Sequence, residues 1–190
     1  MLESEPVASL LERLADGSPT PGGGAAAALT AATAAALLGM VSRVVARRST
    51  AAAAPAEVDD LRRRALALVT EDARAYRGVV EARQVASGRA AALERALLEA
   101  AEPPLEVARL GGAILQRCAA LVGSASGAVR SDLDVAATLA RAALDAACLT
   151  ARANARDLHD RAAAGRLESE LSRLTADAEA PRALAREDQR

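Results

Sequence analysis

Apolar residues recur at intervals of three and four along most of the chain, the spacing that places them on one face of an α-helix. The pattern first appears between a candidate N-cap at Ser4 and a glycine stop at Gly17. It returns in five longer stretches and in a weaker final one, which predict helices over 25–48, 57–85, 87–102, 104–122 and 132–164 and an amphipathic segment at 167–178. No stretch alternates with the period of two that strands show. The sequence therefore predicts an all-α bundle of about six to seven helices.

The chain has 190 residues, a length typical of one domain. We expect residues 1–180 to form that single domain and residues 181–190 to be a flexible tail. Inside the domain, the division between the fourth and fifth helices falls at Pro103 and Pro104, because the residue before a proline disfavours the helical conformation.

The composition is that of a soluble globular protein, with 52% hydrophobic residues, 26% charged residues and a net charge of −1. Tyr76 is the only aromatic residue, and the basic residues are spread beside comparable acidic charge, so we expect no nucleic-acid partner. Cys118 and Cys148 fall within apolar helical patterns without metal-ligand spacing. We interpret them as reduced core residues of a cytoplasmic protein and expect no bound metal.

One stretch is long enough to span a bilayer, because no charge occurs from Pro19 to Ser42. Most of its residues are Ala, Gly and Thr, with few large apolar side chains, and it opens with a Pro/Gly loop. We therefore interpret it as a buried central helix and expect no membrane association.

Asp72 is the clearest polar residue at a predicted buried position. It lies four residues after Leu68, three after Val69 and four before Tyr76, so it shares their apolar face. A carboxylate there must be paired, or its pKa must be raised. Two interpretations stay open: a buried partner for an arginine of another helix, or a carboxylate of a functional site.

Asn154 and Asp157 continue the inner face of the long helix predicted over 132–164. An amide and a carboxylate on such a face could bind a polar ligand, or they could tie neighbouring helices together. At the start of the same helix, Ser131 is a candidate N-cap, and Asp132 suits the positive helix N-terminus. Capping is thus the structural alternative to a catalytic role of Asp132.

The segment "SPTPGGG", residues 18–24, precedes the uncharged helix. Three glycines before a helix can form a tight helix start. They can also let the backbone approach a ligand and present helix N–H groups to its oxygen atoms. The loop has no Walker lysine and follows no strand, so it is neither of the usual nucleotide-binding motifs.

Four stretches in order resemble one known family. Residues 10–41 are similar to the N-terminal signature of the formiminotetrahydrofolate cyclodeaminase / methenyltetrahydrofolate cyclohydrolase family, in which a short helix leads to a Ser-x-x-Pro-Gly-Gly-Gly loop and a small-residue helix. "EDARAYRGVVEA", "EPPLEVAR" and the Ser-Asp opening of the long helix resemble its later motifs. The chain departs from the family pattern at Ser124 and Thr150, where the family has asparagines, and it contains no lysine.

The resemblance implies an all-α homodimer that binds a tetrahydrofolate derivative as its substrate in a cleft between helices. It implies hydrolysis of methenyltetrahydrofolate to formyltetrahydrofolate, or closure of formiminotetrahydrofolate with release of ammonia. We expect the hydrolysis, because no formiminotransferase domain is attached. The competing interpretation is a non-catalytic helical dimer that binds folate or a protein partner.

The resemblance also suggests roles for individual residues. Asp132 and Asp72 are the expected catalytic carboxylates, and Asn154 would orient the pterin or a water molecule. The expected substrate-binding loop consists of Ser18, Pro21, Gly22, Gly23 and Gly24. From guanidinium chemistry alone, we further expect Arg43 or Arg74 to bind the carboxylates of the folate's glutamate tail.

Overall fold

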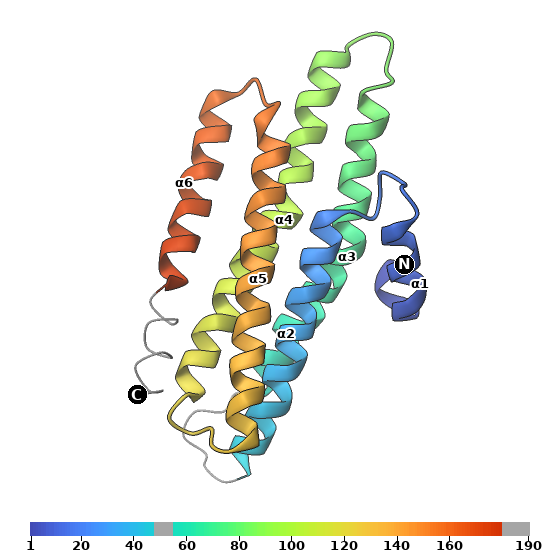
Figure 1. Cartoon of the computed structure of the whole chain (residues 1–190). Coiled ribbons are helices and arrows are strands. Elements are labelled where there is room, and N and C mark those ends of the chain that lie inside the picture. The colour runs from blue at the N-terminus through green and yellow to red at the C-terminus, as the bar shows by residue number, and fades with distance from the viewer. Residues whose placement is uncertain (48–54, 180–190) are drawn as a thin grey trace.

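The computed structural model describes residues 1–47 and 55–179, and every regular element in that part of the chain is helical (Figure 1). This confirms the predicted all-α fold. The predicted tail at 181–190 lies outside the described residues. The elements are a short 3-10 turn and six α-helices: η1 (Leu2–Ser4), α1 (Val7–Ala15), α2 (Gly23–Ala46), α3 (Pro55–Ala82), α4 (Arg89–Leu121), α5 (Ala128–Arg156) and α6 (Arg161–Asp177).

Helix α2 is the central helix and packs against α3, α4 and α5. Its buried face consists mostly of alanine, with Ala28, Ala31 and Ala35 fully inaccessible to solvent. Small side chains let neighbouring helices approach closely, which the alanine-rich composition predicted. A small residue also allows close packing of α4 against α5. At Gly111 of α4, a Cβ atom would lie 3.0 Å from the carbonyl oxygen of Ala140 in α5.

By length and composition alone, α2 is the one helix in the described chain that could cross a membrane. However, 61% of its most apolar window is buried inside the bundle, as in the core helix of a soluble protein. Cys118 and Cys148 are likewise buried free thiols, as expected for core residues.

Helix α4 runs without interruption through Pro103 and Pro104, so the predicted division into two helices was wrong. Each proline removes one backbone N–H from the helix, which leaves the carbonyl four residues earlier without its usual donor. One of these carbonyls, that of Ala100, accepts a hydrogen bond from the side chain of Asn154 in α5 at 2.6 Å. Both prolines are buried, and this tertiary packing outweighs the local preference to end the helix.

The boundaries of α1 and α5 also differ from the predictions. Ser4 lies in η1, and α1 begins only after Pro6. Helix α5 begins at Ala128 with Gly127 as its N-cap, so Ser131 does not cap it; the Ser131 hydroxyl donates to the carbonyl of Ala128.

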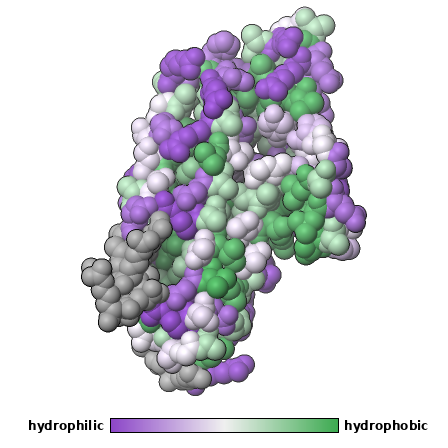
Figure 2. Space-filling view, in the orientation of Figure 1, coloured by the Kyte–Doolittle hydropathy of each residue, from purple (hydrophilic) through white to green (hydrophobic). Residues whose placement is uncertain are grey.

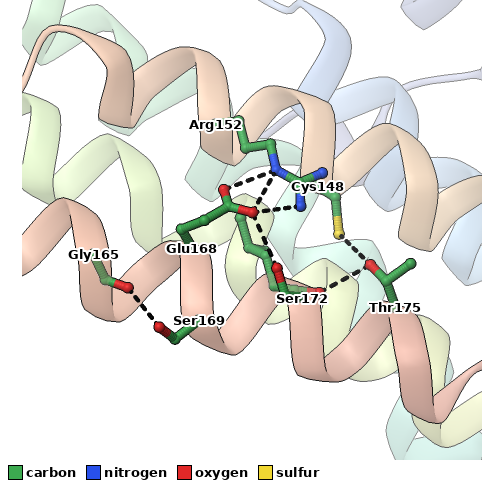
Figure 3. Close-up of polar contacts among 8 residues, drawn as sticks. Cys148, Arg152, Gly165, Glu168, Ser169, Ser172 and Thr175 are labelled. Atoms are coloured by element: carbon green, nitrogen blue, oxygen red, sulfur yellow. Dashed lines mark hydrogen bonds and ion pairs between the residues drawn. The ribbon is translucent and has the colours of Figure 1, made fainter.

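Helix α5 ends at Arg156, before the predicted end of the long helix. Asp160 then caps a new helix, because its carboxylate accepts a hydrogen bond from the N–H of Ala163 at 2.9 Å. The new helix α6 folds back along α5, where Arg152 pairs with Glu168 through two nitrogens (Figure 3).

The helices differ in length, so the central helix α2 does not reach one end of the bundle. Helices α3 and α4 extend beyond the point where α2 begins (Figure 1). Their extensions enclose a second, smaller hydrophobic cluster around Val79, Leu97 and Leu158. The N-terminus of α2 therefore lies between α3 and the C-terminal part of α5. The second hydrophobic cluster lies beyond it, toward this end of the bundle.

Candidate functional site

A pocket of about 450 Å³ lies at the N-terminus of α2, within the usual range for small-molecule sites. It is bounded by the glycine loop, α3, α4 and the last two turns of α5. The residues that line it are Pro19, Thr20, Gly22, Gly23, Gly24, Asp72, Tyr76, Arg83, Leu97, Leu149, Thr150, Ala153, Asn154 and Asp157.

Asp72 lies on the buried face of α3, and only 7% of its surface is exposed. No arginine forms an ion pair with it in the described part of the chain, so the structure does not support the ion-pair interpretation. Burial raises the pKa of the Asp72 carboxyl to about 6, while a hydrogen bond from the backbone N–H of Ala25 partly offsets this rise. Asp72 is therefore a buried carboxyl group that can exchange a proton near neutral pH.

The glycine loop brings the start of α2 against this carboxylate. A Cβ atom on Gly24 would lie 2.7 Å from Oδ2 of Asp72 and closer still to its Cγ and Oδ1. Gly24 is thus the position at which only glycine fits, because any side chain would displace Asp72. Gly23 is exposed, and a Cβ atom there would meet only Thr150 Oγ1, at 3.5 Å.

The first turn of α2 presents backbone donors to the pocket. The N–H of Ala25 donates to Asp72, and the N–H of Ala26 donates to the carbonyl of Gly22. The N–H groups of Gly23 and Gly24 belong to the helix start, where no helical carbonyl can accept from them. An oxygen atom of a ligand is a suitable acceptor for both.

Helix α5 contributes two polar side chains to the opposite wall. Asn154 is buried and donates to the carbonyl of Ala100. This hydrogen bond ties α5 to α4, which was one of the two interpretations of Asn154, and the residue also lines the pocket. Thr150, which stands where the family has an asparagine, donates to the carbonyl of Ala146 and leaves its oxygen able to accept.

Arg83 and Tyr76 are among the pocket residues that sequence reasoning missed. Arg83 is the arginine that lines the pocket, and its side chain pairs with Asp157 at 3.6 Å. Tyr76 also lines the pocket, one helical turn after Asp72. The turn spacing from Asp72 could have identified Tyr76, whereas nothing in the local sequence distinguishes Arg83 from the other arginines.

The structure places four predicted residues away from the pocket lining. Ser18 is exposed and its N–H donates to Asp16, while Pro21 is buried beneath the loop. Arg74 is exposed and lies two residues from Asp72, on another side of α3. Arg43 is about 30 Å along α2 from Gly23 at about 1.5 Å per residue, and it pairs with Asp59.

Asp132 also lies outside the pocket lining of its own chain. It occupies the second turn of α5, about 33 Å from Asn154 along the helix at about 1.5 Å per residue. Within one copy of the protein, it therefore cannot act together with Asp72. Its catalytic role stays a prediction that requires a second copy.

The pocket combines a buried carboxyl with a raised pKa, the backbone N–H groups of a helix start, an amide, an aromatic ring and an arginine. Among residues 1–47 and 55–179, no three His, Cys, Asp or Glu side chains are grouped as metal ligands would be. The fold and the pocket define an all-α protein with a small-molecule site built around a buried acid.

Comparison with known proteins identifies the family. Residues 6–173 match the family model described as formiminotransferase-cyclodeaminase, so the chain belongs to this family. The fold is similar to the crystal structure of a formiminotetrahydrofolate cyclodeaminase from Thermotoga maritima, with a TM-score of 0.89 and 23% sequence identity over 98% of this chain and 96% of that one. A search of curated protein sequences gave no match.

Proposed function

We propose that this protein is a folate-dependent one-carbon enzyme that acts on the carbon between the two folate nitrogens N5 and N10. Family membership favours closure of formiminotetrahydrofolate with release of ammonia. The observation that supports an enzyme is the buried carboxyl of Asp72, which forms no ion pair within residues 1–47 and 55–179 and lies in a pocket of suitable size.

In the ring closure, N10 attacks the formimino carbon and its proton passes to the imine nitrogen. The resulting amine needs one further proton to leave as ammonia. Asp72 supplies that proton as a general acid, a contribution of typically ~10²–10⁴-fold. The carboxylate that remains then faces the cationic methenyl product and stabilises its charge.

In the hydrolysis of methenyltetrahydrofolate, Asp72 acts as a general base instead of a general acid. Water attacks the cationic carbon, and ionised Asp72 accepts the proton that the water loses. The carbinol O–H proton then passes to one of the two nitrogens as its bond to the carbon breaks, which gives the formyl product. Because Asp72 acts as an acid in one reaction and as a base in the other, the two activities differ in their pH dependence.

The remaining pocket residues suit the other parts of a folate. The N–H groups of Gly23 and Gly24 can donate to a carbonyl oxygen of the ligand. Arg83 lines the pocket, whereas Arg43 and Arg74 do not, and we propose that it binds a carboxylate of the glutamate tail, since a guanidinium binds carboxylates through two parallel hydrogen bonds.

The proposal is tested by two assays on the purified protein. We expect ammonia release from formiminotetrahydrofolate, followed in parallel with the disappearance of methenyltetrahydrofolate in an absorbance assay. We also expect tetrahydrofolate to quench the emission of Tyr76, because the only aromatic residue of the chain lies in the pocket. Folate binding without turnover would support the non-catalytic alternative, and absence of both would contradict a folate site.

We further propose that two copies associate through α5. Figure 2 shows apolar side chains along the face that carries α5 and α2, and Val135 and Leu149 of α5 are 49% and 69% exposed. An antiparallel pairing centred on Ala142 would place Val135 of one copy against Leu149 of its partner. The same pairing would bring the partner's Asp132 to the level of Arg152 along the helix, next in sequence to Ala153 of the pocket lining.

The pairing predicts the effects of two substitutions. Val135→Arg should convert a dimer into a monomer in light-scattering measurements, whereas Val7→Arg, at a still more exposed position of α1, should not. Asp132→Asn should leave the dimer intact and lower turnover by about 10²-fold if the partner's carboxylate takes part in the reaction. A monomeric wild type, or an Asp132→Asn variant with full activity, would remove Asp132 from the site.

A further inference from the structure

The carbonyl of Ala100 links a proline of α4 to the pocket. In an uninterrupted helix this carbonyl would accept from the backbone N–H of residue 104, but Pro104 has none. Asn154 Nδ2 takes the place of the missing donor at 2.6 Å. Ala100 and Asn154 are 1% and 6% exposed, so water does not compete effectively for this bond.

The hydrogen bond decides which way the Asn154 amide points. A carbonyl oxygen can only accept, so the group that faces Ala100 must be the NH₂ and not the oxygen of the amide. The Oδ1 atom then points away from Ala100. In the described part of the chain no protein group donates to Oδ1, although Asn154 lines the pocket.

We propose that Pro104 is a positioning residue that fixes the Asn154 amide, so that this wall of the pocket offers a hydrogen-bond acceptor. A ligand that uses this acceptor presents an N–H or O–H donor to Asn154. The inference rests on the proposed folate site, and it assigns the N–H-bearing edge of the pterin, rather than its carbonyl, to the α5 wall.

The orientation of the amide can be tested without any ligand. Asn154 is the only asparagine in the chain, so its side-chain NH₂ signals can be assigned by a single substitution. In Pro104→Ala, the restored N–H of residue 104 competes for the Ala100 carbonyl. We expect the Asn154 NH₂ signals to shift and their hydrogen exchange to accelerate by about tenfold.

Pro103→Ala is the matched control, because Pro103 is also buried in α4. The carbonyl that lacks a donor because of Pro103 is that of Glu99, an exposed residue. The Asn154 signals should be unchanged in this variant. Equal effects of the two substitutions, or no effect of Pro104→Ala, would overturn the proposal.

A double-mutant cycle tests whether Pro104 acts through Asn154. Calorimetric titration with tetrahydrofolate should show that Pro104→Ala weakens binding about fivefold in the wild-type background, and not in Asn154→Leu. In the unfolding transition, Asn154→Leu alone should destabilise the protein, because it leaves the Ala100 carbonyl without a donor, and Pro104→Ala should restore part of this loss.

The outcomes separate this inference from the proposed function. If wild-type protein does not bind tetrahydrofolate, the folate assignment fails, while the NMR and unfolding measurements still decide whether Pro104 orients Asn154. If folate binds but the two substitutions act independently on its affinity, the positioning role fails and the folate site stands.

Discussion

Replacement of Asp72 by asparagine is expected to lower turnover of both folate substrates by about 10²-fold or more while the helical fold is retained. Asparagine has nearly the same shape and can still accept the hydrogen bond from the N–H of Ala25. It cannot donate a proton to the leaving amine, accept one from water or carry the charge that stabilises the methenyl cation. Initial rates at saturating substrate measure the loss, and circular dichroism confirms the fold.

Asp157→Asn is the matched control for this substitution. Asp157 is a second carboxylate that lines the pocket, but its side chain is 56% exposed and pairs with Arg83. We expect it to change the Michaelis constant more than the turnover number, since Asp157 pairs with Arg83, the proposed partner of the folate tail. Comparable losses of turnover in both variants would argue against a special role of Asp72.

Asp72→Asn should also make the folded protein more stable than wild type at neutral pH. In the unfolded chain, the pKa of Asp72 has its ordinary value of 3.8, whereas burial raises it to about 6 in the fold. Below pH 3.8 both states are protonated. Between these values only the unfolded state loses the proton, so the free energy of unfolding falls as pH rises, by about 3 kcal/mol in total at about 1.4 kcal/mol per pH unit.

Chemical denaturation across the pH range isolates this contribution as the difference between wild type and Asp72→Asn. We expect the variant to be more stable by up to about 3 kcal/mol above pH 6, and the advantage to vanish below pH 4. A constant difference over the whole range would show that the Asp72 carboxyl titrates normally in the folded protein. Loss of activity together with gain of stability is the expected behaviour of a functional group held in an unfavourable environment.

The pH dependence of kcat/KM then distinguishes the two reactions. If the protonated acid drives ring closure, kcat/KM should fall as pH rises above about 6. If the ionised carboxylate drives hydrolysis, kcat/KM should fall as pH decreases below the same value. Measurements on wild-type protein with each substrate provide both pH profiles. In Asp72→Asn, the change of kcat/KM near pH 6 should be absent from each profile.

The spacing of apolar residues was sufficient to predict the fold class and the buried position of Asp72. A carboxylate in line with Leu68 and Val69 has to be buried if α3 packs at all, whatever its partners are. Local rules failed where a distant group compensated for a local defect. Pro104 is tolerated inside α4 because Asn154, 50 positions further along the chain, satisfies the carbonyl that it leaves free.

It was harder to predict which residues line the pocket than which types of chemical group it contains. Gly22, Gly23, Gly24, Asp72 and Asn154 are brought together as the motifs suggested. Arg83 enters the pocket only because α3 extends beyond the start of α2, and the length of one helix relative to another is not encoded in any local pattern. For the same reason Arg43, at the far end of α2, lies far from the pocket at the start of this helix.

Gly24→Ala is expected to have the second-largest effect, because it adds the one methyl group for which the site has no room. The new Cβ atom would overlap the Asp72 carboxylate, so that side chain must leave its hydrogen bond with Ala25. We expect a loss of turnover similar to that of Asp72→Asn, together with a destabilisation of about 1–3 kcal/mol from overpacking. Gly23→Ala, whose Cβ would make only an ordinary contact with Thr150, should show neither effect.

A second substitution shows whether the cost of Gly24→Ala arises from Asp72 itself. In an Asp72→Ala background the carboxylate is absent, and the methyl group added at position 24 has space. There Gly24→Ala should be neutral or stabilising by up to about 1 kcal/mol, since alanine is the better helix former. Free energies of unfolding for the two single variants and the double variant measure this coupling. If Gly24→Ala destabilised both backgrounds equally, the glycine would be required by the loop rather than by the carboxylate that it faces.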